Sequence, residues 1–245
     1  MPVSGIALLC VQAFPLGCAK CGGRLLAVHS DNEEITYEFA KAFLSENRKA
    51  VSLAQLSGDK KVPEAKRSAK TLLIETFLNV EQRRMDAAED LEPSSVTAYH
   101  LSNSGQSNPL DQRNSPLAIY HLPLEMTGFL KGVVSPVYRE AWQALARRAW
   151  QLARPKKKRK GDVGIQDDDN NEPRCNLLYE DLFRLPENAA VFVQRYFLRI
   201  PQPYGDEDDP RRAYRTKEEL DLISWKLTEL FVEYVKESIL KRFYK

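Results

Sequence analysis

Two cysteines three residues apart are the first side chains in this sequence that could do chemistry. Cys18 and Cys21 are followed by Gly22 and Gly23, and a C-x-x-C turn of this kind can hold a zinc ion between two thiolates. The remaining ligands would have to come from residues without ligand-pair spacing, namely Cys10, His29, His100, His121 and Cys175. A structural zinc on Cys18 and Cys21 is therefore one hypothesis, and a hairpin turn with buried thiols is the alternative that we favour.

A strip of positive charge is the strongest signal for a binding role. Residues 139–160 contain nine Lys or Arg and one acid, Glu140, which gives the strip a net charge of +8, whereas residues 163–187 have a net charge of −5. Consecutive cations after a helix-stopping proline form a loop that can neutralise nucleic-acid phosphates without reading bases. A nuclear-import signal and a merely solvated loop are the alternatives. The candidate contacts are Arg147, Arg148, Arg154, Lys156, Lys157, Lys158, Arg159 and Lys160.

Two further segments have compositions that suit nucleic acid. Residues 211–215 place a tyrosine among Arg211, Arg212 and Arg215, and Arg can clamp a phosphate while Tyr stacks on an unpaired base. A polar loop contains Asn103 and Gln106, whose amides both donate and accept and so can read base edges. Charges before a helix and polar surface loops are also common without any ligand.

No motif of an enzyme accompanies these segments. The sequence lacks a phosphate-binding loop, a nucleophile elbow and a metalloprotease helix, so we expect a protein that is not an enzyme. The 36 Lys and Arg nearly balance the 34 Asp and Glu, so the net charge of +2 conceals the basic strip. Four cysteines are too few for a secreted disulfide framework, and no apolar run is long enough to span a bilayer. We therefore expect a cytoplasmic protein without a membrane partner.

The hydrophobic pattern of the sequence predicts the strands and helices that must position these residues. Together they indicate an α+β fold, with an N-terminal sheet-containing half followed by a C-terminal helical bundle. The first region, 1–134, is mixed α/β. Its expected elements are strands at 5–14, 24–29, 96–101 and 117–122, the first two paired as a hairpin around the cysteines, and helices beginning at residue 31 or 32 and spanning 63–91.

The second region, 135–245, is expected to be helical, with a charged linker at 155–175. Helices are predicted to begin at Ser135-Pro136, at Pro186 and at Thr216, where Glu219 completes a capping box. The last helix carries an apolar stripe that must be buried against other helices, and its members are Leu220, Ile223, Leu227, Leu230 and Tyr234.

Several stretches together resemble a known family. Residues 16–26 with His29-Ser30-Asp31, the loop 103–106 followed by 119–123, and the segment 185–199 are similar to the large subunit of type I CRISPR Cascade complexes, in the variant of subtypes I-A and I-B. The resemblance covers much of this chain as the C-terminal part of a longer subunit, and its motifs are diffuse.

The resemblance implies a non-catalytic, DNA-binding subunit of an RNA-guided surveillance complex, in antiviral defence or RNA-guided transposition. Its implied partners are a guide RNA, target DNA and the Cascade backbone subunits, together with a helicase-nuclease or transposition factors. In such complexes base pairing reads the sequence while protein holds the backbone, so the subunit would support the guide–target hybrid and the displaced strand. The alternative is a structural assembly protein that acts through its C-terminal helices without touching nucleic acid.

Overall fold

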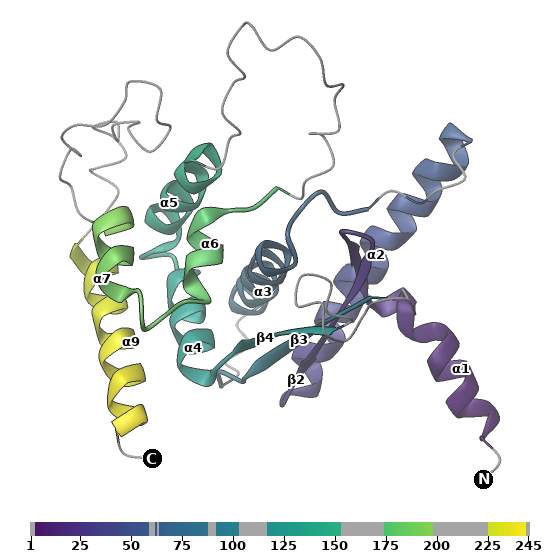
Figure 1. The fold of residues 1–245 in the computed structure, drawn as a ribbon, viewed down its shortest axis with the longest axis horizontal. Coiled ribbons are helices and arrows are strands. Elements are labelled where there is room, and N and C mark those ends of the chain that lie inside the picture. The colour runs from purple at the N-terminus through teal and green to yellow at the C-terminus, as the bar shows by residue number, and fades with distance from the viewer. Residues whose placement is uncertain are drawn as a thin grey trace, which may run out of the picture.

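A computed structural model describes residues 3–58, 62, 64–87, 92–102, 117–152, 174–197 and 225–243 of the 245. It has an α+β fold in which the strands belong to the N-terminal half and the C-terminal part is helical (Figure 1).

The chain begins with a helix where the sequence favoured a strand. Helix α1 (Gly5–Ala13) starts at Ser4, whose hydroxyl accepts the backbone N–H of Ala7 at 3.2 Å, and a 3-10 turn η1 (Phe14–Gly17) follows. The predicted strand at 5–14 is wrong because this run has few β-branched residues and begins at a good helix cap. Consequently it cannot pair with residues 24–29.

A four-stranded antiparallel sheet forms instead from β1 (Ala19–Cys21), β2 (Arg24–Ser30), β3 (Val96–Leu101) and β4 (Leu117–Leu122), in that order. Gly22 and Gly23 connect β1 to β2 with φ values of 57° and 73°, which a two-residue hairpin turn requires. The predicted strands at 24–29, 96–101 and 117–122 are confirmed.

Two helices between β2 and β3 cover one face of this sheet. Helix α2 (Glu33–Ser57) is capped by Asn32, as predicted, and buries Ile35, Phe39 and Phe43. Helix α3 (Ala69–Asp86) is capped by Ser68 and is shorter than the predicted span of 63–91. Both pack against the sheet face that carries the buried Leu26, Val96, Ala98 and Leu122.

The second half of the chain is built from helices around an aromatic cluster. Its elements are α4 (Leu124–Val133), α5 (Arg139–Leu152), α6 (Leu177–Leu182), α7 (Ala189–Phe192), the π-helix η3 (Val193–Phe197) and α9 (Trp225–Phe243). Phe192 stacks on Phe231 with ring centroids 4.8 Å apart, and Phe129 stacks on Tyr234 at 5.0 Å. These contacts join α4, α7 and α9 into one body.

Helix starts in this half differ in part from the prediction. A turn follows Ser135-Pro136, and α5 begins at Arg139, whose N–H donates to the Ser135 carbonyl at 2.9 Å. Likewise, turn residues follow Pro186 before α7 begins at Ala189. The predicted capping box of Thr216 and Glu219 and the linker at 155–173 lie outside the described residues.

The buried residues form one core that both halves share. It runs from Ala19 and Leu26 in the sheet through Phe77 to Leu145 and Phe231 in the helices. The last strand ends at Leu122 and α4 already belongs to the helical part, and the division into regions 1–134 and 135–245 stays a prediction about domains. Within the described ranges, none of the helices combines the length and apolar character that crossing a bilayer requires.

Candidate nucleic-acid interface

Helix α5 presents two of the predicted phosphate contacts. Its buried stripe, made by Ala141, Trp142, Leu145 and Ala149, leaves Arg147 exposed and Arg148 half-buried. The other predicted contacts lie outside the described residues; they are Asn103, Gln106, Arg154, Lys156, Lys157, Lys158, Arg159, Lys160, Arg211, Arg212 and Arg215.

Arg174 pairs through its backbone with two cationic residues that precede α3. Arg174 forms a parallel backbone bridge with Arg67: its N–H donates to the Lys66 carbonyl at 3.0 Å, and its own carbonyl accepts the Ser68 N–H at 2.9 Å. We call Lys66, Arg67 and Arg174 the cationic bridge. Backbone hydrogen bonds thus hold Arg174 beside Lys66 and Arg67, although more than a hundred residues separate it from them in the sequence.

The cationic bridge is only partly neutralised. Arg67 is paired with Glu75, whose carboxylate pKa is raised by burial and lowered in turn by Arg67. Lys66 and Arg174 are exposed, and neither forms an ion pair with another described residue. Among the described residues, Lys66 and Arg174 are therefore two cations beside α3 without an ion-pair partner. Each one that contacts phosphate would change the slope of log K against log salt by about one.

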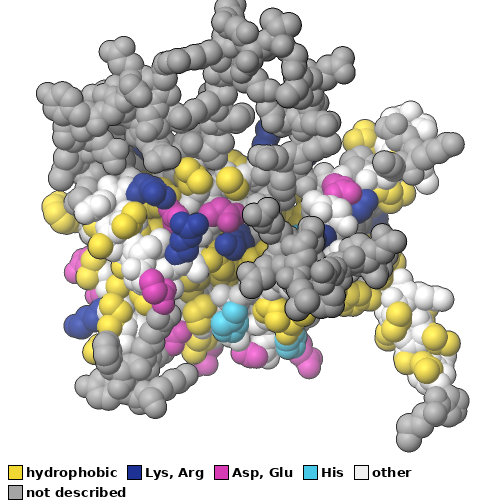
Figure 2. All heavy atoms as spheres, viewed as in Figure 1, with side chains coloured by type: hydrophobic (Ala, Val, Ile, Leu, Met, Phe, Trp, Pro, Cys, Tyr) yellow, Lys and Arg dark blue, Asp and Glu magenta, His cyan; other side chains and the backbone are white. Residues whose placement is uncertain are grey.

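A lysine held between aromatic rings lies next to the bridge on α3. The Lys70 ammonium sits 5.8 Å from the centre of the Tyr120 ring and 5.5 Å from that of Phe183, and it is 3.6 Å from the Glu180 carboxylate. Tyr120 and Phe183 meet edge to face at 5.9 Å. Figure 2 shows Lys and Arg side chains interspersed with acidic ones over α6 and its neighbours. This surface is mixed rather than uniformly basic.

The two cysteines of the C-x-x-C motif do not converge on one site. The backbone from Cys18 to Cys21 is extended, and residues three apart on an extended strand point to opposite faces. Accordingly, the Cys18 thiol lies 3.2 Å from the Phe14 carbonyl oxygen, whereas the Cys21 thiol lies 3.5 Å from His100 Nε2. Among the described residues, no group of three or more His, Cys, Asp and Glu is arranged to hold a metal ion.

Burial keeps the Cys21–His100 pair neutral. Desolvation, reinforced by Glu64, raises the pKa of Cys21 to about 11, and desolvation alone raises that of Cys18 to about 11. Desolvation also lowers the pKa of His100, with a further lowering from Arg24. A neutral thiol beside a neutral imidazole is the opposite of the thiolate–imidazolium pair that nucleophilic cysteines use.

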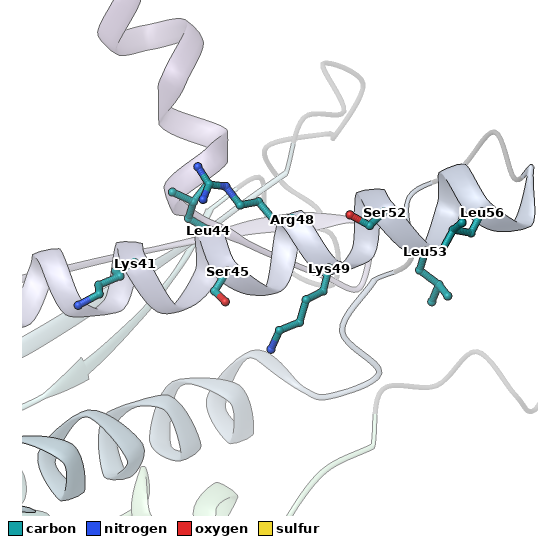
Figure 3. Close-up of a pocket in the computed structure, with 8 residues that line it drawn as sticks. All are labelled: Lys41, Leu44, Ser45, Arg48, Lys49, Ser52, Leu53 and Leu56. Atoms are coloured by element: carbon teal, nitrogen blue, oxygen red, sulfur yellow. The ribbon is translucent and has the colours of Figure 1, made fainter.

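The outer surface of α2 carries a hollow of about 690 Å³. Figure 3 shows its lining residues along this one helix, with Lys41, Ser45 and Lys49 directed to one side and Leu44 and Arg48 to the other. None of the residues predicted as functional contributes to this hollow.

The sequence did not predict the cationic bridge or the position of Lys70 near the rings of Tyr120 and Phe183. Lys66 and Arg67 precede a helix in an ordinary charged segment, and Arg174 lies among acids. Only their pairing in space distinguishes them, and no spacing in the sequence indicates that pairing. No protein-family model, no curated protein and no solved structure matches this chain.

Proposed function

We propose that this protein is a non-catalytic, nucleic-acid-binding subunit of an RNA-guided complex of the type I CRISPR Cascade class. It contacts phosphate backbone and supports the guide–target hybrid and the displaced strand. Its partners in this proposal are guide RNA, target DNA and backbone subunits, and its compartment is the prokaryotic cytoplasm. A helicase-nuclease or transposition factor acts after it.

The observation that carries the proposal is the placement of cations around the basic strip. Arg147 is exposed on α5, which precedes the strip's run of lysines, and Arg174 of the cationic bridge follows the strip in the sequence. The cationic bridge adds two exposed cations, Lys66 and Arg174, to those of the +8 segment, to which Arg147 belongs. The sequence resemblance adds the specific class of complex.

The test is a salt titration of binding to a DNA duplex, an RNA–DNA hybrid and a single strand, read by fluorescence anisotropy with the full chain. Changing Lys66→Gln, Arg147→Gln and Arg174→Gln together should weaken binding and flatten the slope of log K against log salt by about two to three. The matched control changes three cations on α2, Lys41→Gln, Arg48→Gln and Lys49→Gln, and so alters net charge equally.

An equal loss in both triple variants would indicate a diffuse charge effect, and an unchanged slope in the first would reject the interface. Co-purification of the full chain with a short RNA and backbone subunits tests the Cascade class separately. A chain that binds nucleic acid but never recruits such an RNA would retain the binding role and lose the Cascade assignment.

The alternative of an assembly protein acting through its C-terminal helices has one observation in its favour. Helix α9 exposes Trp225, Val232, Ile239 and Leu240 on the side away from the core. The stripe that suggested this alternative is itself core, because Leu227 and Tyr234 are buried and Leu230 is half-buried. Leu220 and Ile223 lie outside the described residues.

A further inference from the structure

Helix α1 exposes apolar side chains in every direction. No residue of this helix is buried, and Ile6, Leu9 and Val11 are 76%, 64% and 72% exposed. Figure 1 shows α1 and the end of α2 extending beyond the other elements on the same side of the molecule. A nine-residue helix is only marginally stable in water on its own, so its stability depends on packing.

The composition of α1 indicates whether a membrane or a protein surface covers this helix. Its sequence GIALLCVQA contains no charged residue and only one polar side chain, Gln12. A helix that lies in a membrane interface needs a polar face, which α1 lacks, and nine residues span about 14 Å, too short to cross a bilayer. A helix that is apolar all round is buried between protein surfaces.

The same chain carries a second apolar surface beside the base of α1. Helix α2 exposes Leu53 and Leu56 at 59% and 87% along its last turns, where both line the hollow described above, and Val51 is 41% exposed on another side of the helix. The base of α1 is fixed to α2, because Asn47 Nδ2 donates to the Leu16 carbonyl at 3.1 Å and to the Cys18 carbonyl at 2.9 Å. In Figure 3, Leu44 and Arg48 point toward the end of α1.

We propose that α1 and the exposed part of α2 form the interface of a homodimer, in which α1 packs between α1 and α2 of a second copy. A two-fold axis makes such an interface self-complementary, so each copy gives and receives the same contacts. This arrangement supplies the two apolar surfaces that a helix without a polar face requires. The inference does not rest on the nucleic-acid role proposed above.

The available area supports a second copy as the occupant. Each copy offers nine exposed large apolar side chains, which are Ile6, Leu8, Leu9, Val11, Phe14 and Leu16 from α1 and η1 and Val51, Leu53 and Leu56 from α2. If each side chain loses about 60 Å², two copies bury about 1,000 Å², the lower bound of a specific interface. We therefore expect a dissociation constant in about the micromolar range.

Charge also favours a second copy over an anionic partner. Lys41 and Lys49 beside the hollow already pair with Glu38 at 3.0 Å and Glu46 at 2.6 Å. An uncharged α1 from a second copy leaves these exposed ion pairs intact. An anionic ligand would have to compete with both acids and would leave the leucines of α1 uncovered.

Sedimentation of the full chain over a range of concentrations tests the dimer. Leu9→Asp with Val11→Asp on α1, and Leu53→Asp with Leu56→Asp on α2, should each weaken association by tenfold or more, because each double variant places two charges in the apolar interface. The matched control, Val137→Asp with Val191→Asp, changes two exposed valines elsewhere and should leave the dimer intact. Circular dichroism verifies that each variant remains folded.

Cys10 supplies an independent measurement, since this natural thiol is exposed on α1. A short bismaleimide should link two wild-type copies through Cys10, and Cys10→Ser should remove that product while any product through Cys175 remains. A monomer at every concentration, a dimer that persists in both double variants, or no linkage through Cys10 would overturn the proposal. So would a monomer that binds phosphatidylserine vesicles through Leu9 and Val11.

Discussion

At the scale of single residues, Cys21 and His100 show how burial alters reactivity. Cys21 is 1% exposed, and its thiol contacts His100 Nε2 at 3.5 Å. The same imidazole nitrogen lies 3.2 Å from the Cys21 carbonyl oxygen, so one ring bonds both the side chain and the backbone of the hairpin. The contact ties β1 to β3, which are not neighbours in the sheet.

The first residue-scale prediction concerns thiol labelling. A pKa raised from 9.0 to about 11 leaves Cys21 with about 100-fold less thiolate at neutral pH than an ordinary cysteine, and burial blocks access as well. Iodoacetamide on the native protein, followed by mass spectrometry, should therefore modify exposed Cys10 long before Cys18 or Cys21. Rapid modification of Cys21 in the folded chain would contradict the buried hairpin, and labelling in denaturant provides the control.

The second concerns pH and the lowered pKa of His100. Because its folded pKa lies below its unfolded value of about 6.5, the unfolded chain binds more protons than the folded chain below that pH. This contribution to stability is complete above about pH 6.5 and is lost as pH falls through the folded pKa. Urea unfolding across pH should show a smaller acid-side loss in His100→Asn than in the wild type, and His121→Asn provides an exposed-histidine control. Identical pH dependence in the wild type and His100→Asn would exclude His100 as a source.

At the scale of elements, one side of α9 packs into the core. Phe231 contacts Phe192 on α7, Phe129 on α4 and Phe197 on η3, with ring centroids 4.8, 5.8 and 5.1 Å apart. An aromatic side chain that reaches three other elements fixes the position of the helix that carries it. The apolar stripe of the last helix was correctly expected to be buried, as far as Leu227 and Tyr234 show.

The prediction at the scale of elements concerns the loss of stability when the Phe231 side chain is truncated. Phe231→Ala should reduce the free energy of unfolding by about 3–5 kcal/mol, since it opens a cavity among the surrounding aromatic rings. Val232→Ala is the control, because this neighbour is 52% exposed and should change stability by less than about 0.5 kcal/mol. Denaturant unfolding measures both. A small effect of Phe231→Ala would mean that α9 does not pack as described.

At the scale of the whole molecule, one core serves both the sheet and the helices. We therefore expect the chain to unfold in a single cooperative step. Circular dichroism, which reports all helices, and the fluorescence of Trp142 and Trp150, which both lie on α5, should give the same midpoint once exposed Trp225 is changed to Phe. Two separate transitions would instead support independent domains at 1–134 and 135–245.

Local patterns predicted much of this fold because they act over a few residues. Two stretches rich in strand-forming residues on either side of a polar loop indicated β3 and β4, and Asp31 or Asn32 was expected to start the helix that Asn32 caps. The same reasoning failed at α1, because an unbroken apolar run suits either a buried strand or a helix. The Ser4 cap and the lack of β-branched residues decided that case locally.

The candidate site was predicted only in part. Arg147 and Arg148 were predicted from the charge of the basic strip, and the buried stripe of α5 leaves Arg147 exposed and Arg148 half-buried. The less favoured zinc hypothesis required Cys18 and Cys21 to converge, and a spacing of three residues does not decide this, because it brings side chains together on a turn and separates them on a strand.

The sequence by itself determined the α+β class, three of the four strands, most of the helices and the charge segregation, all of which depend on neighbours along the chain. Only the tertiary structure decided that Arg174 lies beside Lys66 and Arg67, that Cys21 meets His100, and that α1 and the end of α2 stay uncovered. These contacts join residues far apart in sequence. Their formation depends on how the whole core packs, which no local spacing records.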